Sequence, residues 1–396
     1  MNYTFSDKVQ NLKPSAIREI FKYAANPEYI SLSAGNPAPE AFPTKAIEEI
    51  SAKILKEEPI LALQYSVTEG YPPLKETLVN YMSEKHSVGS DDDDILITSG
   101  AQQIADLLSK SMLNEGDTVI CEAPSFIGCL NTFRSYNAKL KGIPMEKDGI
   151  NIEALEEALK TEKKVKFIYV IPNFQNPSGI TMSLAKRKKV YELAVKYSVP
   201  ILEDNPYGDL RYQGEHLPCI KSFDTEGIVF YAGSFSKVIA PGMRVAYVIA
   251  PKEVIGKMAV CKQGADVHTN IWSQVVCHRF MTEYDFDAHL DGLRQLYTVK
   301  SKLLLDLMEK NFAPYITWDE FDGGLFAWCH LPKGVDMLDF CQKAVERKVC
   351  VVPGSAFLAD ESEETDAFRI NFSTPSDEQL TKGIEVLGQL IKDIME

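Results

Sequence analysis

The sequence has no excess of positive charge. Its 396 residues carry 56 acidic and 42 basic side chains, which gives a net charge of −14 and a pI of about 5.1. Nucleic acids and anionic membranes attract clusters of Lys and Arg, so we expect neither as a partner. A small anionic ligand is compatible with this charge, because a few local cations are enough to hold it.

Long apolar runs and cysteine pairs are missing as well. No stretch approaches the roughly 18 uninterrupted apolar residues of a membrane span, and the N-terminal segment lacks the apolar core of a secretory signal. The eight cysteines include no CxxC pair, so no metal site is expected. Scattered free thiols are typical of a reducing compartment, and we therefore expect a cytoplasmic protein.

The middle of the chain alternates short β-rich runs with helical segments. This alternation predicts an α/β fold with a mostly parallel sheet, helices on both of its faces, and functional loops at the carboxyl ends of the strands. The predicted strands are 95–98, 118–122, 166–172, 199–204, 228–234 and 244–250, and the predicted helices are 101–113 and 183–197.

The C-terminal part follows a different, α+β pattern. Its strand-like runs are 323–332, 349–357 and 368–373, with helices near 335–347 and 376–395. The N-terminal helix 15–24 and the segment 31–37 have no βα partner of their own, so we expect them to pack on this smaller domain. The predicted fold is a large domain on a mixed, mostly parallel seven-stranded sheet, plus a smaller α+β domain made from both termini. The predicted boundaries are 1–45 for the N-terminal arm with part of the small domain, 46–285 for the large domain and 286–396 for the small domain.

The most informative stretch is GSFSKVIAPGMR (233–244), which places Lys237 just after a buried strand. A partly desolvated lysine loses some of its preference for the charged form and can form a Schiff base with an aldehyde. Ser234, Ser236 and Arg244 nearby suit a phosphate dianion. A surface lysine in a Ser-rich loop explains this stretch equally well when it is taken alone.

Polar side chains follow two further strands. Asp204 ends the strand in ILEDNPYGDL (201–210), where its carboxylate could keep a pyridine nitrogen protonated. Tyr207 could reach the phenolic oxygen of such a ring, and so could Asn176 in the loop IPNFQNPSG (171–179). An Asp that caps a turn and a plain turn are the alternatives.

Two anion-binding candidates lie at opposite ends of the chain. TSGAQQ (98–103) joins a strand to a helix, so Gly100 and the free N–H groups of the helix start could form a phosphate cup. Neither GxxxxGK[ST] nor GxGxxG occurs, which excludes the common nucleotide-binding loops. Arg369 in FRINFS lies among apolar residues and needs an anionic partner, either a substrate carboxylate or a structural carboxylate.

In this order the motifs TSGAQQ, EAPSF, NPSG, EDNPYGDL, SFSK and FRINFS closely resemble the fold-type-I, class I/II aminotransferases, over roughly residues 30–375. Within that family the chain is most similar to the 2-aminoadipate and kynurenine aminotransferases. The MocR-type regulators share the fold in their effector domain. The resemblance implies pyridoxal 5′-phosphate (PLP) as cofactor, held by Lys237 as a Schiff base, and it implies transfer of an amino group from an L-amino acid to a 2-oxo acid, with 2-oxoglutarate as acceptor, by a ping-pong mechanism.

The resemblance also assigns roles to individual residues. Lys237, Asp204 and Tyr207 are the implied catalytic residues, and Gly35, Asn176 and Arg369 the implied substrate-binding residues. Tyr65, in LQYSVTEGYPPLKE (63–76), is implied to reach the cofactor phosphate of the partner subunit in a homodimer. The cofactor-binding residues implied in the same way are Ser99, Gly100, Ala101, Gln102, Phe126, Asn176, Asp204, Tyr207, Ser234, Ser236, Lys237 and Arg244.

Three positions depart from the family pattern or are ambiguous. Phe126 stands where a Tyr or Trp often stacks on the ring, so a hydroxyl is lacking there. Ala101 offers only its backbone N–H to a phosphate. Arg18, in AIREI, occupies a place where this subgroup can contact an acidic substrate side chain, and an exposed helix arginine is the alternative.

Other functions remain as alternatives to weigh. A PLP-dependent lyase, decarboxylase or aldolase could use the same fold, but Arg369 favours substrates that keep their carboxylate. A PLP-binding regulator of the MocR type needs a DNA-binding domain, and about 30 residues before the matching region are too few for one. Ser234 to Lys237 reads S-x-x-K, as in serine acylases, but the companion motifs S-D-N and K-T-G are missing.

Overall fold

The structure is a computed structural model that describes residues 3–6, 8, 23 and 26–396. Its larger part is built on one eight-stranded sheet. Strand β9 runs antiparallel to both of its neighbours, and β5 runs antiparallel to β4, while the other pairs are parallel. In spatial order the strands are β2 (Asp93–Thr98), β9 (Ala246–Pro251), β8 (Val229–Ser234), β7 (Ile201–Asp204), β6 (Val165–Val170), β3 (Thr118–Ala123), β4 (Lys139–Glu146) and β5 (Gly149–Ile150).

The sheet has one strand more than the seven predicted. Strand β5 has only two residues, Gly149 and Ile150, which pair with the end of β4. A strand this short leaves no period-two pattern in the sequence. The central strands β6, β7 and β8 are buried along most of their length, as expected for strands covered on both faces.

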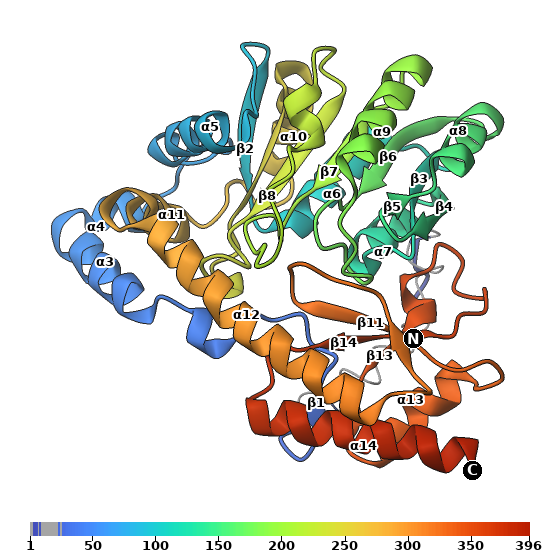
Figure 1. Cartoon of the computed structure of the whole chain (residues 1–396). Coiled ribbons are helices and arrows are strands. Elements are labelled where there is room, and N and C mark those ends of the chain that lie inside the picture. Colours follow the sequence, from blue (N-terminus) through green and yellow to red (C-terminus); the bar gives the residue numbers. More distant parts are fainter. Residues whose placement is uncertain (1–2, 7, 9–22, 24–25) are drawn as a thin grey trace.

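Helices cover both faces of this sheet (Figure 1). One face packs on α6, α7 and α10, whose apolar side chains form one core with β2, β3 and β6–β9. The other face packs on α8 and α9 at one end and on α5, α11 and the start of α12 at the other. The helices of this part are α3 (Thr44–Glu57), α4 (Pro59–Leu63), α5 (Pro72–His86), α6 (Ala101–Met112), α7 (Ile127–Ser135), α8 (Ile152–Thr161), α9 (Leu184–Tyr197), α10 (Lys252–Gln263) and α11 (Ile271–Glu283), with the 3-10 turns η1 (Pro39–Ala41), η2 (Ile220–Phe223) and η3 (Pro241–Met243).

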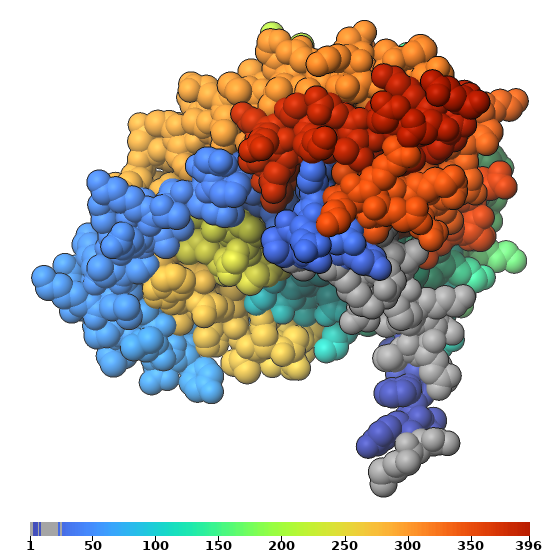
Figure 2. Space-filling model, turned by 90° about the horizontal axis from the view of Figure 1, so that it is seen from below, coloured from blue at the N-terminus to red at the C-terminus, as the bar shows by residue number. Residues whose placement is uncertain are grey.

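The smaller part combines the C-terminal region with the start of the described chain. Strand β1 pairs in parallel with β12, and Leu32 lies in the same apolar core as the C-terminal helices. Figure 2 shows these blue segments lying against the orange and red C-terminal part. The prediction of a small α+β domain made from both ends of the chain is therefore confirmed for the segment 31–37, whereas the predicted helix 15–24 lies, except for residue 23, outside the described residues. Its elements are β1 (Ile30–Ser31), β10 (Thr317–Trp318), β11 (Phe326–His330), α13 (Met337–Glu346), β12 (Val349–Cys350), β13 (Val352–Pro353), η4 (Gly354–Phe357), β14 (Ala367–Asn371) and α14 (Asp377–Met395).

Helix α12 (Phe286–Asn311) belongs to both parts (Figure 1). Its first half, with Leu290 and Tyr297, packs in the core beside the sheet. Its second half, with Leu304 and Met308, packs in the core of the smaller domain. The predicted boundary at 285/286 thus falls at the start of a shared helix, and the three predicted domain ranges stay predictions.

Candidate active site

A cavity of about 310 Å³ lies where the carboxyl ends of β6, β7 and β8 face the smaller domain. It brings together twelve of the residues that the sequence singles out. Five further lining residues, which the sequence analysis missed, are mostly apolar: Asn36, Ile127, Ile171, Pro206 and Phe326. The predicted residues that line the cavity are Gly35, Ala101, Gln102, Phe126, Asn176, Asp204, Tyr207, Ser234, Ser236, Lys237, Arg244 and Arg369.

Lys237 lies in the turn that follows β8, and its ammonium points into the cavity. Nζ donates a hydrogen bond of 2.7 Å to the carbonyl of Gly35 and lies 6.0 Å from the ring centroid of Tyr207. Burial, helped by the cations Arg369 and Arg244, lowers the pKa of Lys237 to about 8. The amine is therefore much closer to its neutral, nucleophilic form than an exposed lysine is.

Asp204 ends β7 with its carboxylate buried at the cavity wall. Oδ2 accepts a hydrogen bond of 2.8 Å from the hydroxyl of Tyr169. Oδ1 is also buried, and no described residue pairs with it. Burial raises the pKa of Asp204 to about 6, and the Tyr169 hydrogen bond opposes that rise. A buried carboxylate with one free oxygen is an open acceptor for a protonated ligand nitrogen.

A hydrogen-bonded chain crosses the cavity from the sheet to the smaller domain. The Asn176 amide donates to the Tyr207 hydroxyl at 3.4 Å, and Nη1 of Arg369 donates to the Asn176 Oδ1 at 2.8 Å. Burial raises the pKa of Tyr207, so its hydroxyl stays protonated. Asn176 therefore links a phenol in the large domain to a guanidinium in the small one.

Arg369 stands on β14 and is almost fully buried. Nη2 donates to the Ser33 carbonyl at 2.7 Å, and the guanidinium lies over the rings of Phe326 and Phe357 at 4.2 and 5.0 Å. Its Nε is buried without a partner among the described residues, and burial lowers the pKa of Arg369 to about 10. No carboxylate of the described chain neutralises this cation, so it is available to an anionic ligand.

The loop before α6 faces Arg244. Gly100 has φ +86, and a Cβ at this position would lie 2.1 Å from Arg244 Nη2, so any side chain here would strain the backbone and displace the guanidinium. Arg244 Nη2 donates to the Ser99 carbonyl at 3.3 Å. The first-turn amides of Ala101 and Gln102 lie beside this guanidinium, which together make an anion-binding cup.

Some predicted groups point away from this cup. The Ser99 hydroxyl donates to Asp266 at 2.7 Å, and neither Ser99 nor Gly100 lines the cavity. The Gln102 side chain donates to the Gly128 carbonyl at 2.9 Å, which leaves its backbone amide as the group that can serve an anion. Ser234 and Ser236 do line the cavity, and the Ser234 hydroxyl accepts from the Ser236 amide at 3.1 Å.

One predicted residue of the described chain lies elsewhere. Tyr65 follows α4, is 83% exposed, and its ring meets the ring of His268 edge-on at 5.9 Å. It does not line the cavity of its own subunit. Arg18 lies outside the described residues.

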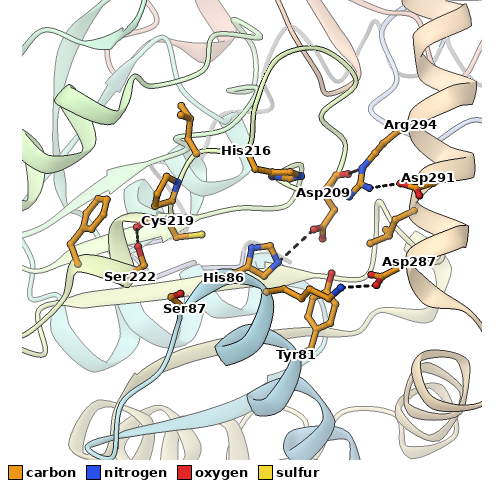
Figure 3. A pocket seen from close by; sticks show the side chains of 15 residues that line it. Tyr81, His86, Ser87, Asp209, His216, Cys219, Ser222, Asp287, Asp291 and Arg294 are labelled. Carbon is orange, nitrogen blue, oxygen red and sulfur yellow. Dashed lines mark hydrogen bonds and ion pairs between the residues drawn. The ribbon is translucent and has the colours of Figure 1, made fainter.

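A second cavity, of about 710 Å³, lies between the end of α5, the loop 209–219 and α12 (Figure 3). Its charged groups pair with one another: Lys85 with Asp287 and Arg294 with Asp291, both at 2.6 Å. Asp209 faces His86 at 3.8 Å. Although this cavity is the larger one, its two cations are already neutralised by their own carboxylates, so we do not take it as the active site.

The described residues contain neither a metal-binding cluster nor a membrane-spanning helix. No group of three or more His, Cys, Asp or Glu side chains is placed to hold a metal ion. No described helix is long and apolar enough to cross a membrane.

Comparison with known proteins identifies the family. Residues 27–387 match the model of the aminotransferases of class I and II. The chain belongs to this family. It is 39% identical to the aromatic-amino-acid aminotransferase 1 of Thermococcus litoralis, over 99% of this chain and 95% of that protein. It is 34% identical to the 2-aminoadipate transaminase of Thermus thermophilus, over 99% and 97%.

Solved structures agree with this family. The kynurenine aminotransferase of Pyrococcus horikoshii, solved in complex with PMP, superposes with a TM-score of 0.95 at 37% identity, covering 99% of this chain and 98% of the other. For this class I/II aminotransferase the predictions of family, fold, transaminase activity and PLP as cofactor are therefore confirmed. The roles of the individual residues are not tested by these comparisons.

Proposed function

We propose that this aminotransferase moves the amino group of an aromatic or large apolar L-amino acid to a 2-oxo acid, with 2-oxoglutarate as acceptor. One observation carries the residue assignment. The same cavity is lined by a lysine with a lowered pKa, a carboxylate with a free oxygen and an arginine without a carboxylate partner. These are the groups that a PLP ring and the carboxylate of an amino acid need.

The residues present fit PLP. The free Oδ1 of Asp204 matches a protonated pyridine nitrogen, and Asn176 and Tyr207 are placed for the ring oxygen. The cup of Ala101, Gln102, Ser234, Ser236 and Arg244 matches the phosphate, since a Cβ at Gly100 would fill the place of the Arg244 guanidinium. Phe126 lines the same cavity and offers a ring face for stacking.

When bound, the cofactor supplies an electron-withdrawing ring that stabilises negative charge at the substrate Cα. Asp204, as an anion, would hold the ring nitrogen protonated. Lys237 would anchor the cofactor through its weakly basic amine and, once freed, take the proton from the substrate Cα. Gly35, whose carbonyl accepts from Lys237, keeps this amine aimed into the cavity.

Arg369 would bind the substrate carboxylate through Nε, which is buried without a partner among the described residues, with Asn176 beside it. This role favours transamination over decarboxylation, because the carboxylate is held rather than released. The remaining walls are mostly apolar, with Phe126, Ile127, Ile171 and Phe326, which suits an aromatic or aliphatic side chain. The predicted contact of Arg18 with an acidic side chain stays a prediction.

We further propose a cytoplasmic homodimer in which Tyr65 reaches the cofactor phosphate of the partner subunit. Apolar side chains gather on the outside of α4 and the loop after it. Ile60, Leu63 and Val67 are 72, 73 and 50% exposed, and Tyr65 stands among them. A second copy would cover this patch.

Borohydride reduction of the holoenzyme, followed by peptide mass spectrometry, tests the anchor. We expect a phosphopyridoxyl group on Lys237, and a label on another lysine or on none would contradict the assignment. Mixing the enzyme with single amino acids and no acceptor tests the reaction. Aromatic and large apolar donors should yield pyridoxamine phosphate and the matching 2-oxo acid, and failure across a broad panel would exclude transamination.

A further inference from the structure

Tyr169 stands on β6 beside the strand that carries Asp204. In the register of β6 and β7, Tyr169 lies opposite Leu202. Asp204 is two residues further along β7, so it shares a sheet face with Leu202 and is the diagonal neighbour of Tyr169. A diagonal neighbour is within reach of a long aromatic side chain. The Tyr169 hydroxyl uses this reach to donate to Asp204 Oδ2 at 2.8 Å.

The ring that carries this hydroxyl is held rigidly. Tyr169 is fully buried, and its ring meets the edge of Phe133 at 5.5 Å, which in turn packs on Phe167 at 5.4 Å. The thiol of Cys129, itself 3% exposed, lies beside this hydroxyl. Aromatic packing and this thiol therefore fix the hydroxyl at one place, against one oxygen of Asp204.

The two oxygens of Asp204 have different surroundings. Oδ2 is occupied by Tyr169, whereas Oδ1 has no partner among the described residues. The other titratable groups that interact with Asp204 are Glu122, Cys129 and Tyr207, and none of them is a cation. Burial raises the pKa of Glu122 to about 8, which favours the neutral form of this neighbour at pH 7. In the described part of the chain, the hydroxyl of Tyr169 is thus the one hydrogen-bond donor found to stabilise the anionic form of Asp204.

We propose that Tyr169 is a positioning residue, which holds Asp204 Oδ2 so that Oδ1 is presented as an anion to the ring nitrogen of PLP. The inference rests on the proposed function, because it assumes that PLP binds with its nitrogen toward Asp204. Tyr169 itself touches neither cofactor nor substrate.

The first test uses the protein without cofactor. The infrared band of the protonated Asp204 carboxyl group, assigned as the band that Asp204→Asn removes, is followed against pH. Losing a hydrogen bond to a charged group shifts a pKa by about one unit. We therefore expect the midpoint of Tyr169→Phe to lie about one unit above that of the parent protein. An unchanged midpoint overturns the proposal.

A matched control removes a tyrosine hydroxyl of the same kind elsewhere. Tyr136 donates to Asp106 at 3.0 Å, away from the cavity. Tyr136→Phe should leave the Asp204 midpoint unchanged. If Tyr169→Phe does not fold, 3-fluorotyrosine placed at position 169 replaces it as the test. Its more acidic hydroxyl is the stronger donor, so the midpoint should fall, and an unchanged midpoint again overturns the proposal.

The second test uses the holoenzyme. A rise of one unit in the pKa of Asp204 changes the proton equilibrium between Asp204 and the ring nitrogen by a factor of ten. The kcat of Tyr169→Phe should therefore fall about tenfold while KM stays nearly constant. The nitrogen-15 signal of labelled cofactor should move toward the unprotonated ring in Tyr169→Phe and stay in place in Tyr136→Phe. A signal that does not move in Tyr169→Phe contradicts the proposal.

Different results contradict the proposed function and the role of Tyr169. A parent protein that takes up no PLP on Lys237 contradicts the proposed function. A parent protein that takes it up, together with a Tyr169→Phe variant whose carboxyl midpoint, nitrogen signal and kcat are all unchanged, contradicts only the role of Tyr169.

Discussion

The two cavities described above differ in how their charges are satisfied. In the larger one, Lys85 and Arg294 each hold a carboxylate of α12 at 2.6 Å, at the edge of solvent (Figure 3). In the smaller one, Asp204 and Arg369 are buried, and each keeps one polar atom without a partner. Volume therefore does not locate the chemistry. Buried charge that lacks a partner and also lines a cavity is the better guide, because a ligand bound there can complete the pairing.

The largest effect is expected at Lys237. Without its amine, neither the cofactor anchor nor the proton acceptor remains, so Lys237→Ala should lower kcat by about a thousandfold or more. Lys85→Ala is the matched control in the second cavity and should leave kcat within twofold. Steady-state kinetics on both variants measure this contrast. A comparable loss in Lys85→Ala would show that the second cavity takes part in the reaction.

Arg369 comes next. Arg369→Lys keeps the charge but loses the planar pair of donors, so kcat/KM for the amino acid should fall about a hundredfold, or about 2.7 kcal/mol. Arg294→Lys makes the same change in the second cavity, where the exposed pair contributes little. Equal kcat/KM values for the two variants would refute the proposed carboxylate site.

The third prediction concerns how the stability of the cofactor-free protein depends on pH. Because the folded-state pKa of Asp204 lies near 6, above its ordinary value of 3.8, the cofactor-free protein loses stability as the pH rises from about 4 to 6. Above pH 6 Asp204 is ionised, and its burial then lowers the free energy of unfolding by on the order of 2–3 kcal/mol. Asp204→Asn should remove this cost and raise the melting temperature of the cofactor-free protein at pH 7.5, but not at pH 4.

Asp291→Asn is the control for this pH prediction. Its carboxylate is 65% exposed and paired with Arg294, so its loss should change stability by less than about 1 kcal/mol at either pH. Melting curves at the two pH values decide the matter. A cofactor-free Asp204→Asn protein that melts below the parent at pH 7.5 would show that the carboxylate is satisfied after all.

The smallest effect is expected on PLP binding, at the phosphate cup beside Gly100. A methyl group at Gly100 would collide with Arg244 and would also stand at φ +86, so Gly100→Ala should weaken PLP binding about tenfold. Gly116 has a similar φ of +77 with open space around it, so Gly116→Ala imposes the strain without the collision. Equilibrium dialysis of PLP separates the two. Equal affinity in both variants would assign the effect to backbone strain alone.

Much of the fold and of the site could be predicted because both are encoded locally. Lys237, Asp204 and Asn176 each follow a strand, and the carboxyl ends of parallel strands meet at one edge of the sheet. Tyr169 was missed because its hydrogen bond to Asp204 depends on the register between β6 and β7, and this register cannot be read from either segment alone. Phe326 was missed because its position over Arg369 depends on how the small domain packs on the large one.

The direction of a side chain was also beyond local sequence. The Ser99 hydroxyl turns to Asp266, and the Gln102 amide to the Gly128 carbonyl, because loops distant in sequence offer better partners than the cavity does. Likewise, β5 could not be predicted, since two residues become a strand only through the neighbour with which they pair. Motif order therefore identified the site, whereas its inner geometry required the fold.

Helix α12 sets how this protein melts. Its 26 residues span about 39 Å and supply side chains to the cores of both domains. Loss of this helix would remove packed side chains from both cores, so we expect the two domains to unfold together. Melting in a single transition would show that two domains of distinct architecture form one cooperative unit.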